Sequence, residues 1–156
     1  DWMPTLLAAA GDDNVVEELK KGKRVGGERY KVHLDGYDFL PYFLGEVDEG
    51  PRKEFVYTSD TGDIVGYRRG DWKLVFREQR AHGLEVWQDP YVTLRMPKIF
   101  NLRMDPFERM DHEGAGYSQW LGEHMFLFAP VMAEVAKFKA TFKEFPQRQK
   151  PGSFVP

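Results

Sequence analysis

Carboxylates and imidazoles that could bind a metal ion or move a proton occur at several points in this 156-residue chain. Three aspartates, Asp60, Asp63 and Asp71, carry the oxygen ligands that Ca²⁺ and Mg²⁺ prefer. Each stands beside residues typical of tight turns, where aspartate is favoured because its side chain bonds to the local backbone. The pattern therefore favours turn residues over a metal site.

Two further groups place carboxylates beside imidazoles, at Asp111-His112-Glu113 and at Glu123-His124. Such pairs could bind a metal ion or exchange a proton with a substrate. Neighbouring residues on a helix or a strand point apart, however, so adjacency in sequence does not bring these side chains together. We therefore predict no metal ligands in this chain.

The candidate lining of a substrate cleft lies in residues 79–99, the least regular stretch of the chain. Loops often carry functional residues, and His82 could exchange a proton at neutral pH. Trp87 and Tyr91 could form an aromatic wall of the same cleft. The alternatives are a surface position for His82 and packing beneath the loop for the two aromatic residues. Lys73 is interpreted as a sheet residue and not as a catalytic lysine.

The elements that would position these residues begin with a small sheet. Residues 54–59, 63–68 and 72–77 are strand-like stretches joined by turns of a few residues, which predicts an antiparallel meander. Residues 79–99 are predicted to form a long loop with one short strand near Val92.

A turn is predicted after this loop. Asp105-Pro106 interrupts the strand pattern that Asn101 completes, and a proline disfavours helical geometry in the residue before it. In this turn Glu108 and Arg109 are near enough in sequence to form a local ion pair. The turn therefore marks the exit from the last predicted strand.

The last third of the chain predicts a long amphipathic helix that follows a shorter helical piece at 118–126. Its apolar residues recur at three- and four-residue steps and so share one face: Phe128, Val131, Val135, Phe138, Phe142 and Phe145. This face can cover one side of the sheet, with a coiled coil as the alternative. The predicted fold class is α+β, a small antiparallel sheet of about four strands packed against a long C-terminal helix.

The first third is predicted to be less regular. Residues 1–11 indicate a short helix that ends at Gly11, and residues 12–34 indicate a polar connection followed by a first strand at 31–34. Residues 37–45 are aromatic-rich and broken by Pro41, which indicates a short helix or a loop.

Composition excludes several classes of function. A net charge of −3 with no basic stripe does not suit the binding of nucleic acid. No apolar run approaches the roughly 20 residues needed to span a bilayer, so no membrane partner is predicted. The absence of cysteine excludes disulfides, thiolate metal sites and cysteine nucleophiles.

Four segments, taken together and in order, resemble a known family. They are DWMPTLLAAAG at 1–11, DGYDFLPYFLGE at 35–46, YRRGDWKLVF at 67–76 and FNLRMDPFERMD at 100–111. In this order they resemble the C-terminal part of the formylglycine-dependent sulfatases, most closely bacterial arylsulfatases. The resemblance runs over nearly the whole chain.

The resemblance implies a domain organisation and a parent chemistry. Residues 1–11 would be a helix at the edge of a sulfatase catalytic domain, 12–34 a connection with a first strand, and 35–156 the C-terminal subdomain. The parent reaction would be hydrolysis of a sulfate ester, with formylglycine and a divalent cation, usually calcium. The family's (Cys/Ser)-x-Pro-x-Arg motif is missing, because none of Ser59, Ser118 and Ser153 has the required proline and arginine after it.

We therefore predict a chain that is non-catalytic alone and binds no cofactor. Its expected partner is the catalytic domain of a sulfatase or a second copy of itself, and the resemblance implies a periplasmic or exported location. The first alternative is a stand-alone, self-associating structural or binding module. A weaker alternative is an unrelated hydrolase activity carried by histidine and carboxylate groups. The parent substrate stays open among aryl sulfates, sugar sulfates and phosphonate monoesters.

Overall fold

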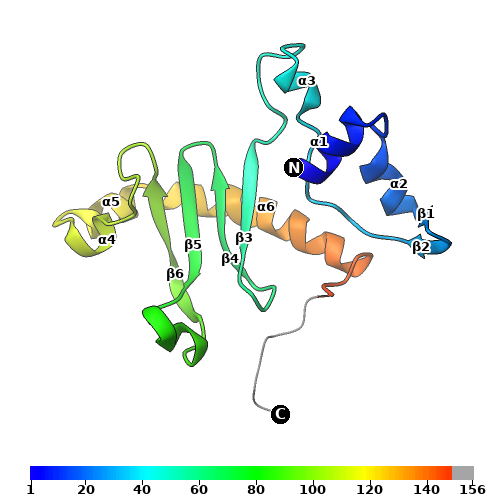
Figure 1. Cartoon of the computed structure of the whole chain (residues 1–156). Coiled ribbons are helices and arrows are strands. Elements are labelled where there is room, and N and C mark those ends of the chain that lie inside the picture. The colour runs from blue at the N-terminus through cyan, green and yellow to red at the C-terminus, as the bar shows by residue number, and fades with distance from the viewer. Residues whose placement is uncertain (149–156) are drawn as a thin grey trace. The chain divides into compact units, whose positions relative to one another are not determined.

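The computed structural model describes residues 1–148 and consists of two compact units (Figure 1). The N-terminal unit comprises Asp1–Lys53, and the sheet unit begins at Glu54. The division falls later in sequence than residue 35, where the resemblance places the start of a C-terminal subdomain. The last residues of that predicted subdomain, 149–156, lie outside the described residues.

The N-terminal unit consists of short elements. Helix α1 (Trp2–Ala9) is followed by α2 (Val15–Lys21), by a hairpin of β1 (Lys23–Val25) and β2 (Glu28–Tyr30), and by α3 (Leu40–Phe43). The structure confirms the predicted helix at the start of the chain and, of the two interpretations of residues 37–45, the short helix.

Residues 12–34 differ from their prediction. The segment predicted as a polar connection contains α2, whose Val15 and Leu19 are buried one helical turn apart among charged residues. The strand expected at 31–34 is absent from the described structure, because pairing with β1 ends at Tyr30. The hairpin turn is made by Gly26-Gly27, both with positive φ, as a two-residue turn of this twist requires.

The sheet unit contains four antiparallel strands in sequence order. They are β3 (Glu54–Thr58), β4 (Ile64–Arg69), β5 (Trp72–Glu78) and β6 (Val92–Asn101). The predicted meander is thus confirmed, and so is a strand that begins at Val92. That strand, β6, is longer than predicted and runs for ten residues, so the loop predicted over 79–99 is wrong in its second half. Pro97 interrupts the sequence pattern there. It is tolerated because β6 is an edge strand, where an N–H facing outward has no ladder partner to lose.

Helices follow the sheet and cover it. After the single turn α4 (Met110–Glu113) and α5 (Tyr117–Glu123), helix α6 (Phe128–Ala140) crosses behind the strands in Figure 1. Short 3-10 turns precede and follow α6, at Met125–Leu127 and Thr141–Lys143.

The core lies between α6 and the sheet. Leu74 of β5 and Ile99 of β6 are fully buried, and they cluster with Val131 and Val135 of α6. Trp72 and Phe76 on the same face of β5 as Leu74 pack against this core, as alternation predicts. The helix therefore covers the sheet and does not form a coiled coil, and the predicted α+β fold class is confirmed.

One finding concerns membranes. Among the described residues, no helix has the length and apolar character needed to cross a bilayer.

Candidate functional site

The three residues predicted to line a cleft are all exposed. His82 directly precedes a 3-10 turn, η1 (Gly83–Trp87), whose last residue, Trp87, is 75 % exposed. Tyr91 is 38 % exposed. Within residues 1–148 no ring contact joins Trp87 to Tyr91. The structure thus places the three side chains on the surface and brings no two of them together through their rings.

The three aspartates considered as metal ligands, Asp60, Asp63 and Asp71, lie in the connections between β3, β4 and β5. Asp63 pairs with Arg77 at 2.5 Å and accepts a hydrogen bond from the Thr61 hydroxyl at 3.1 Å. The carbonyl of Asp71 accepts the Leu102 N–H at 2.7 Å. In the part of the chain that the structure describes, no three His, Asp or Glu side chains converge as metal ligands would.

A half-buried charge cluster joins β5, β6 and α4. The Lys98 Nζ lies 2.5 Å from a carboxylate oxygen of Glu78 and 2.5 Å from one of Asp111, whose side chain is only 5 % exposed. Burial opposes charging of both Lys98 and Glu78. Their mutual hydrogen bond, together with bonds from Lys98 to Asp111 and from Arg80 to Glu78, outweighs burial, so the pKa of Lys98 is raised and that of Glu78 is lowered.

This cluster could not be found from sequence spacing. Glu78, Lys98 and Asp111 are far apart in sequence. The β5–β6 ladder pairs Lys98 with Val75 and Glu78 with Val92, with an irregular register between Val75 and Arg77. The Lys98 side chain reaches both carboxylates only in the folded arrangement of the two strands and α4. His112, next to Asp111 in sequence, has its Nε2 3.2 Å from the Asp111 carboxylate and is itself exposed. The cluster contains cations and carboxylates that neutralise one another, and no hydroxyl or thiol nucleophile takes part. It ties α4 to the sheet.

A second lysine, Lys73, is bound by both oxygens of a single carboxylate. The Lys73 Nζ donates to both carboxylate oxygens of Glu108, at 2.7 and 2.8 Å, and lies 4.7 Å from the centre of the Tyr57 ring. The predicted local pair of Glu108 with Arg109 is therefore wrong, because Arg109 pairs instead with Glu113 one helical turn away. Lys73 serves as a sheet residue, fully engaged by its carboxylate partner.

The turn that carries Glu108 is defined by side-chain bonds to the backbone. The Asn101 carboxamide oxygen accepts the N–H groups of Arg103 and Met104, and the Asp105 carboxylate accepts those of Arg109 and Met110. Glu108 itself has φ +55°, a conformation that costs a non-glycine residue about 1 kcal/mol. We call residues 101–110, with the Lys73–Glu108 pair, the turn lock.

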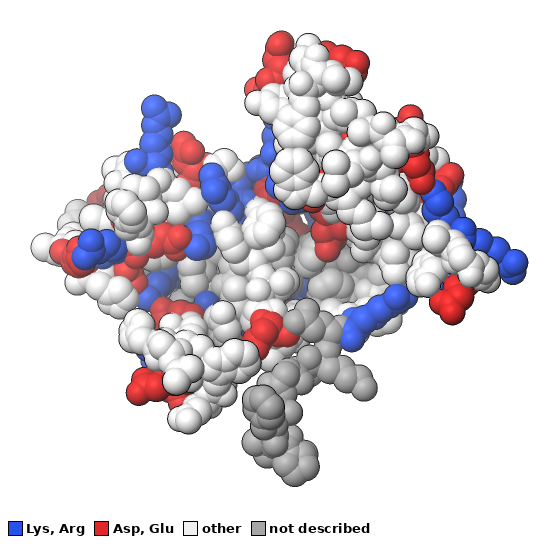
Figure 2. All heavy atoms as spheres, viewed as in Figure 1, with Lys and Arg blue, Asp and Glu red and all other residues white. Residues whose placement is uncertain are grey.

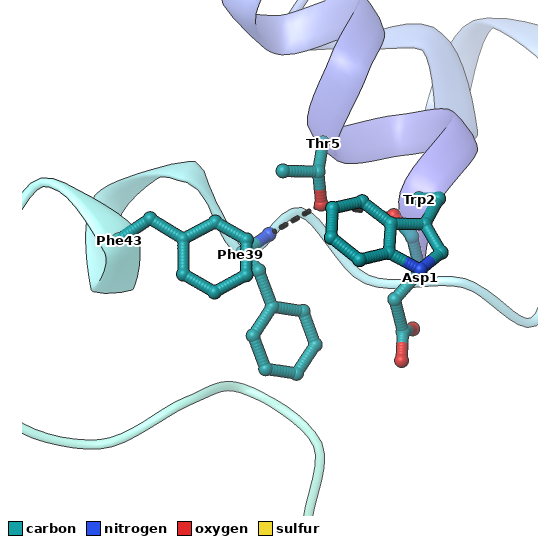
Figure 3. Close-up of a pocket in the computed structure, with 5 residues that line it drawn as sticks. All are labelled: Asp1, Trp2, Thr5, Phe39 and Phe43. Atoms are coloured by element: carbon teal, nitrogen blue, oxygen red, sulfur yellow. Dashed lines mark hydrogen bonds between the residues drawn. The ribbon is translucent and has the colours of Figure 1, made fainter.

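The N-terminal unit contains a hollow of about 200 Å³. Figure 3 shows the five residues that line it: Asp1, Trp2, Thr5, Phe39 and Phe43. Thr5 is buried and its hydroxyl donates to the Asp1 carbonyl at 2.8 Å while accepting the Phe39 N–H at 2.9 Å. Through this hydroxyl the first turn of α1 holds the segment that leads into α3.

The Asp1 carboxylate provides a second link within this unit. It accepts the Tyr37 N–H at 2.8 Å and two N–H groups of Arg52, at 2.7 and 2.5 Å. The Arg52 guanidinium also donates to the Asp35 carbonyl at 2.8 Å and lies 4.9 Å from the centre of the Tyr37 ring. We call these bonds, with those of Thr5, the N-terminal lock.

The ring geometry decides what the hollow can accept. The Trp2 and Phe43 ring centres are 6.2 Å apart, and those of Phe39 and Phe43 are 5.9 Å apart. Rings at these separations are in direct contact with one another and form an apolar wall of the hollow. A partner group would lie on the rings, over Trp2 and Phe43, which are 71 % and 57 % exposed. Because the Asp1 charge is neutralised by Arg52, this surface suits apolar contact and not chemistry.

Comparison with known proteins adds no assignment. No family model matches this chain, and no curated protein matches it.

Proposed function

We propose that this chain is the non-catalytic C-terminal part of a sulfatase-like hydrolase, whose catalytic domain it would bind and whose cleft it would help to close. One observation carries the proposal: the four segments of the sulfatase resemblance pair two by two through specific side-chain bonds. Asp1 and Thr5 of the first segment bond to Tyr37 and Phe39 of the second. Lys73 of the third bonds to Glu108 of the fourth.

These bonds give the residues that carry the sulfatase resemblance a structural role. A residue whose side chain holds two distant segments together is needed for the fold, whether or not the chain catalyses a reaction. Asp1, Thr5, Lys73 and Glu108 are residues of this kind. Such roles suit a part of a sulfatase that shapes the enzyme without supplying its formylglycine or its divalent cation. The parent reaction, sulfate-ester hydrolysis, would depend on residues of the catalytic domain.

The surface of α1 supports a docking role. Trp2, Met3 and Leu6 are 71, 53 and 62 % exposed, an unusual density of large apolar side chains on one eight-residue helix. Isolated exposed apolar residues are ordinary, but a contiguous group indicates an interaction surface. The catalytic domain would bury this group.

The test is turnover of a chromogenic aryl sulfate by the purified chain, with and without added calcium, beside an aryl phosphate and a carboxylic ester. The proposal predicts no turnover of the sulfate under either condition. Activity that follows the protein through purification, and that is lost in His82→Ala, would contradict it. Activity on the carboxylic ester or phosphate alone would favour the independent hydrolase.

A second candidate function is a self-associating structural module. The observation that favours it is exposure of large apolar residues in the sheet unit as well, including Met104 at 75 % and Phe107 at 79 %. A stand-alone module would show one cooperative unfolding transition and a defined oligomer. Non-cooperative unfolding and ill-defined aggregates would favour a chain that needs a catalytic domain to fold fully.

A further inference from the structure

The turn lock presents two large apolar side chains in a fixed geometry. Met104 and Phe107 are 75 % and 79 % exposed, although the backbone around them is held by the Asn101 and Asp105 side chains. The Leu102 N–H, bonded to the Asp71 carbonyl, also ties this turn to the turn between β4 and β5. An aromatic residue on a rigid backbone loses little conformational entropy when it is buried by a partner, which makes it an effective anchor.

Strain at the same turn is a second observation. Glu108, directly after Phe107, keeps a positive φ because Lys73 holds its carboxylate with two hydrogen bonds. Strained residues persist where the surrounding structure over-determines them, and they occur preferentially at functional positions. The strain is thus maintained beside the most exposed aromatic side chain of the turn.

Two exposed arginines, Arg69 and Arg103, lie at the same end of the sheet as this anchor, as does exposed Asp71. The ladder pairs Arg69 with Trp72 and Trp72 with Asn101, which brings exposed Arg69 to the same end of the sheet as exposed Arg103. Figure 2 shows Lys and Arg side chains at the upper left of the view, with Asp or Glu side chains beside them. A partner for the turn would therefore present carboxylates around an apolar surface.

This chain itself carries a surface of that kind. Phe43, the last residue of α3, and Leu44 and Val47 of the loop that follows are 57, 63 and 47 % exposed. Glu46 and Asp48 of the same loop are exposed, and acidic side chains gather at this tip of the N-terminal unit in Figure 2. We call residues 43–49 the acidic loop. It combines exposed apolar area with negative charge, and so complements the apolar side chains and the arginines at the turn.

We propose that the turn lock of one copy docks on the acidic loop of a second copy, with Phe107 and Met104 against the apolar residues of the loop and Arg69 and Arg103 against its carboxylates. Two different surfaces meet in such a contact. Association is therefore head-to-tail and produces a ring where the rotation closes, or a longer chain of copies where it does not. This inference does not depend on the sulfatase-like role proposed above.

Sedimentation velocity of the purified chain over a range of concentrations tests the proposal. We expect concentration-dependent association that weakens between low and high salt, because the contact includes charge pairs. Met104→Ser/Phe107→Ser should weaken association about tenfold or more, as loss of a central anchor does. The matched control, Leu84→Ser/Trp87→Ser, changes two side chains that are 85 and 75 % exposed elsewhere and should leave association unchanged.

Charge reversal identifies the two surfaces. Arg69→Glu/Arg103→Glu and Glu46→Lys/Asp48→Lys should each be monomeric alone. Mixed, they should associate, because the acidic turn of one variant meets the basic loop of the other. The control pair Arg95→Glu/Lys139→Glu, at exposed positions away from the turn, should associate as the wild type does.

Three results would overturn the proposal: a wild type that stays monomeric at high concentration, controls that weaken association as much as the test variants, or a mixture that stays monomeric. Circular dichroism of each variant checks that the fold is retained. A monomeric wild type would leave the sulfatase-like role untouched, since that role is tested by turnover, and turnover would in turn leave self-association untouched.

Discussion

The N-terminal lock and the turn lock both join segments that are distant in sequence, but the units that contain them differ in how many side chains they bury. In each, a charged pair and hydrogen bonds to the backbone join segments more than 30 residues apart, Asp1 to Tyr37 and Lys73 to Glu108. The turn lock lies on a sheet whose Leu74 and Ile99 are fully buried. The N-terminal lock lies in a unit whose buried side chains, among the described residues, are Pro4, Thr5, Val15 and Leu19.

Because of this difference, the two locks contribute unequally to the stability of their units. The sheet unit is stabilised mainly by its buried apolar core. Its lock therefore fixes only a local turn. The N-terminal unit has so little buried apolar surface that its few polar bonds form a large share of what holds it together. Apolar substitutions should therefore matter most in the sheet unit, and polar ones in the N-terminal unit.

The largest expected effect is in the sheet core. Leu74→Ala removes a fully buried side chain and should lower the free energy of unfolding by about 3 kcal/mol, because it leaves a cavity between the sheet and α6. Leu84→Ala, at an 85 % exposed position, should change it by less than about 0.5 kcal/mol. Urea unfolding followed by circular dichroism measures both. Equal effects would mean that the core does not lie where we place it.

The next effect is in the N-terminal lock. Thr5→Val keeps the shape of the side chain but leaves the Phe39 N–H without its acceptor, which should cost the N-terminal unit about 1–2 kcal/mol. The methyl NMR signals of Val15 and Leu19, followed through a urea titration, report this unit specifically. The control is Thr93→Val, at an exposed position of β6. If the urea midpoint of these signals in Thr5→Val equals that of the wild type, the polar bonds of the N-terminal lock do not have the larger share in stability that we assign to them.

A smaller effect separates strain from ion pairing in the turn lock. Glu108→Ala and Glu108→Gly both lose the bond to Lys73, but only glycine adopts φ +55° without cost. Glu108→Gly should therefore be about 1 kcal/mol more stable than Glu108→Ala when the two are compared by urea unfolding. Equal stability would show that the positive φ stores no energy.

The smallest effect is the pH dependence of the charge cluster. The pKa of Glu78 is lower in the folded chain than in the unfolded chain, so its contribution is present above its ordinary pKa and is lost as pH falls through the lowered one. The pKa of Lys98 is raised, so its contribution is present below its ordinary pKa and is lost as pH rises through the raised one. Glu78→Gln should remove the acid-side loss of stability, as measured by urea unfolding at several pH values. An unchanged acid-side slope would contradict the coupling.

Much of the sheet unit could be predicted from the sequence. Tight turns between 54 and 77 fix a meander, and the spacing of Val131 and Val135 fixes the buried face of α6. The extent of β6 could not be predicted, because Pro97 breaks the local pattern and only its edge position permits a strand there. The helix α2 was hidden because its two buried residues stand among five other residues, four of them charged.

The candidate sites were less predictable than the fold. Spacing singled out His82, Trp87 and Tyr91 because they share an irregular loop, yet sequence proximity did not bring their rings together. The Lys73–Glu108 pair and the Asp1–Arg52 pair join residues 35 and 51 positions apart. Their proximity depends on tertiary structure, for which local patterns carry no signal.

Residue-resolved amide hydrogen exchange of the wild type, Thr5→Val and Glu108→Ala is the most direct test of structural roles for the four resembling segments. We predict that Thr5→Val speeds exchange throughout the N-terminal unit and leaves β5 and β6 protected. Glu108→Ala should speed exchange at 101–110 and leave Tyr37 and Phe39 unchanged. Unchanged exchange in both variants would contradict the account, because the residues that carry the sulfatase resemblance would then hold nothing together.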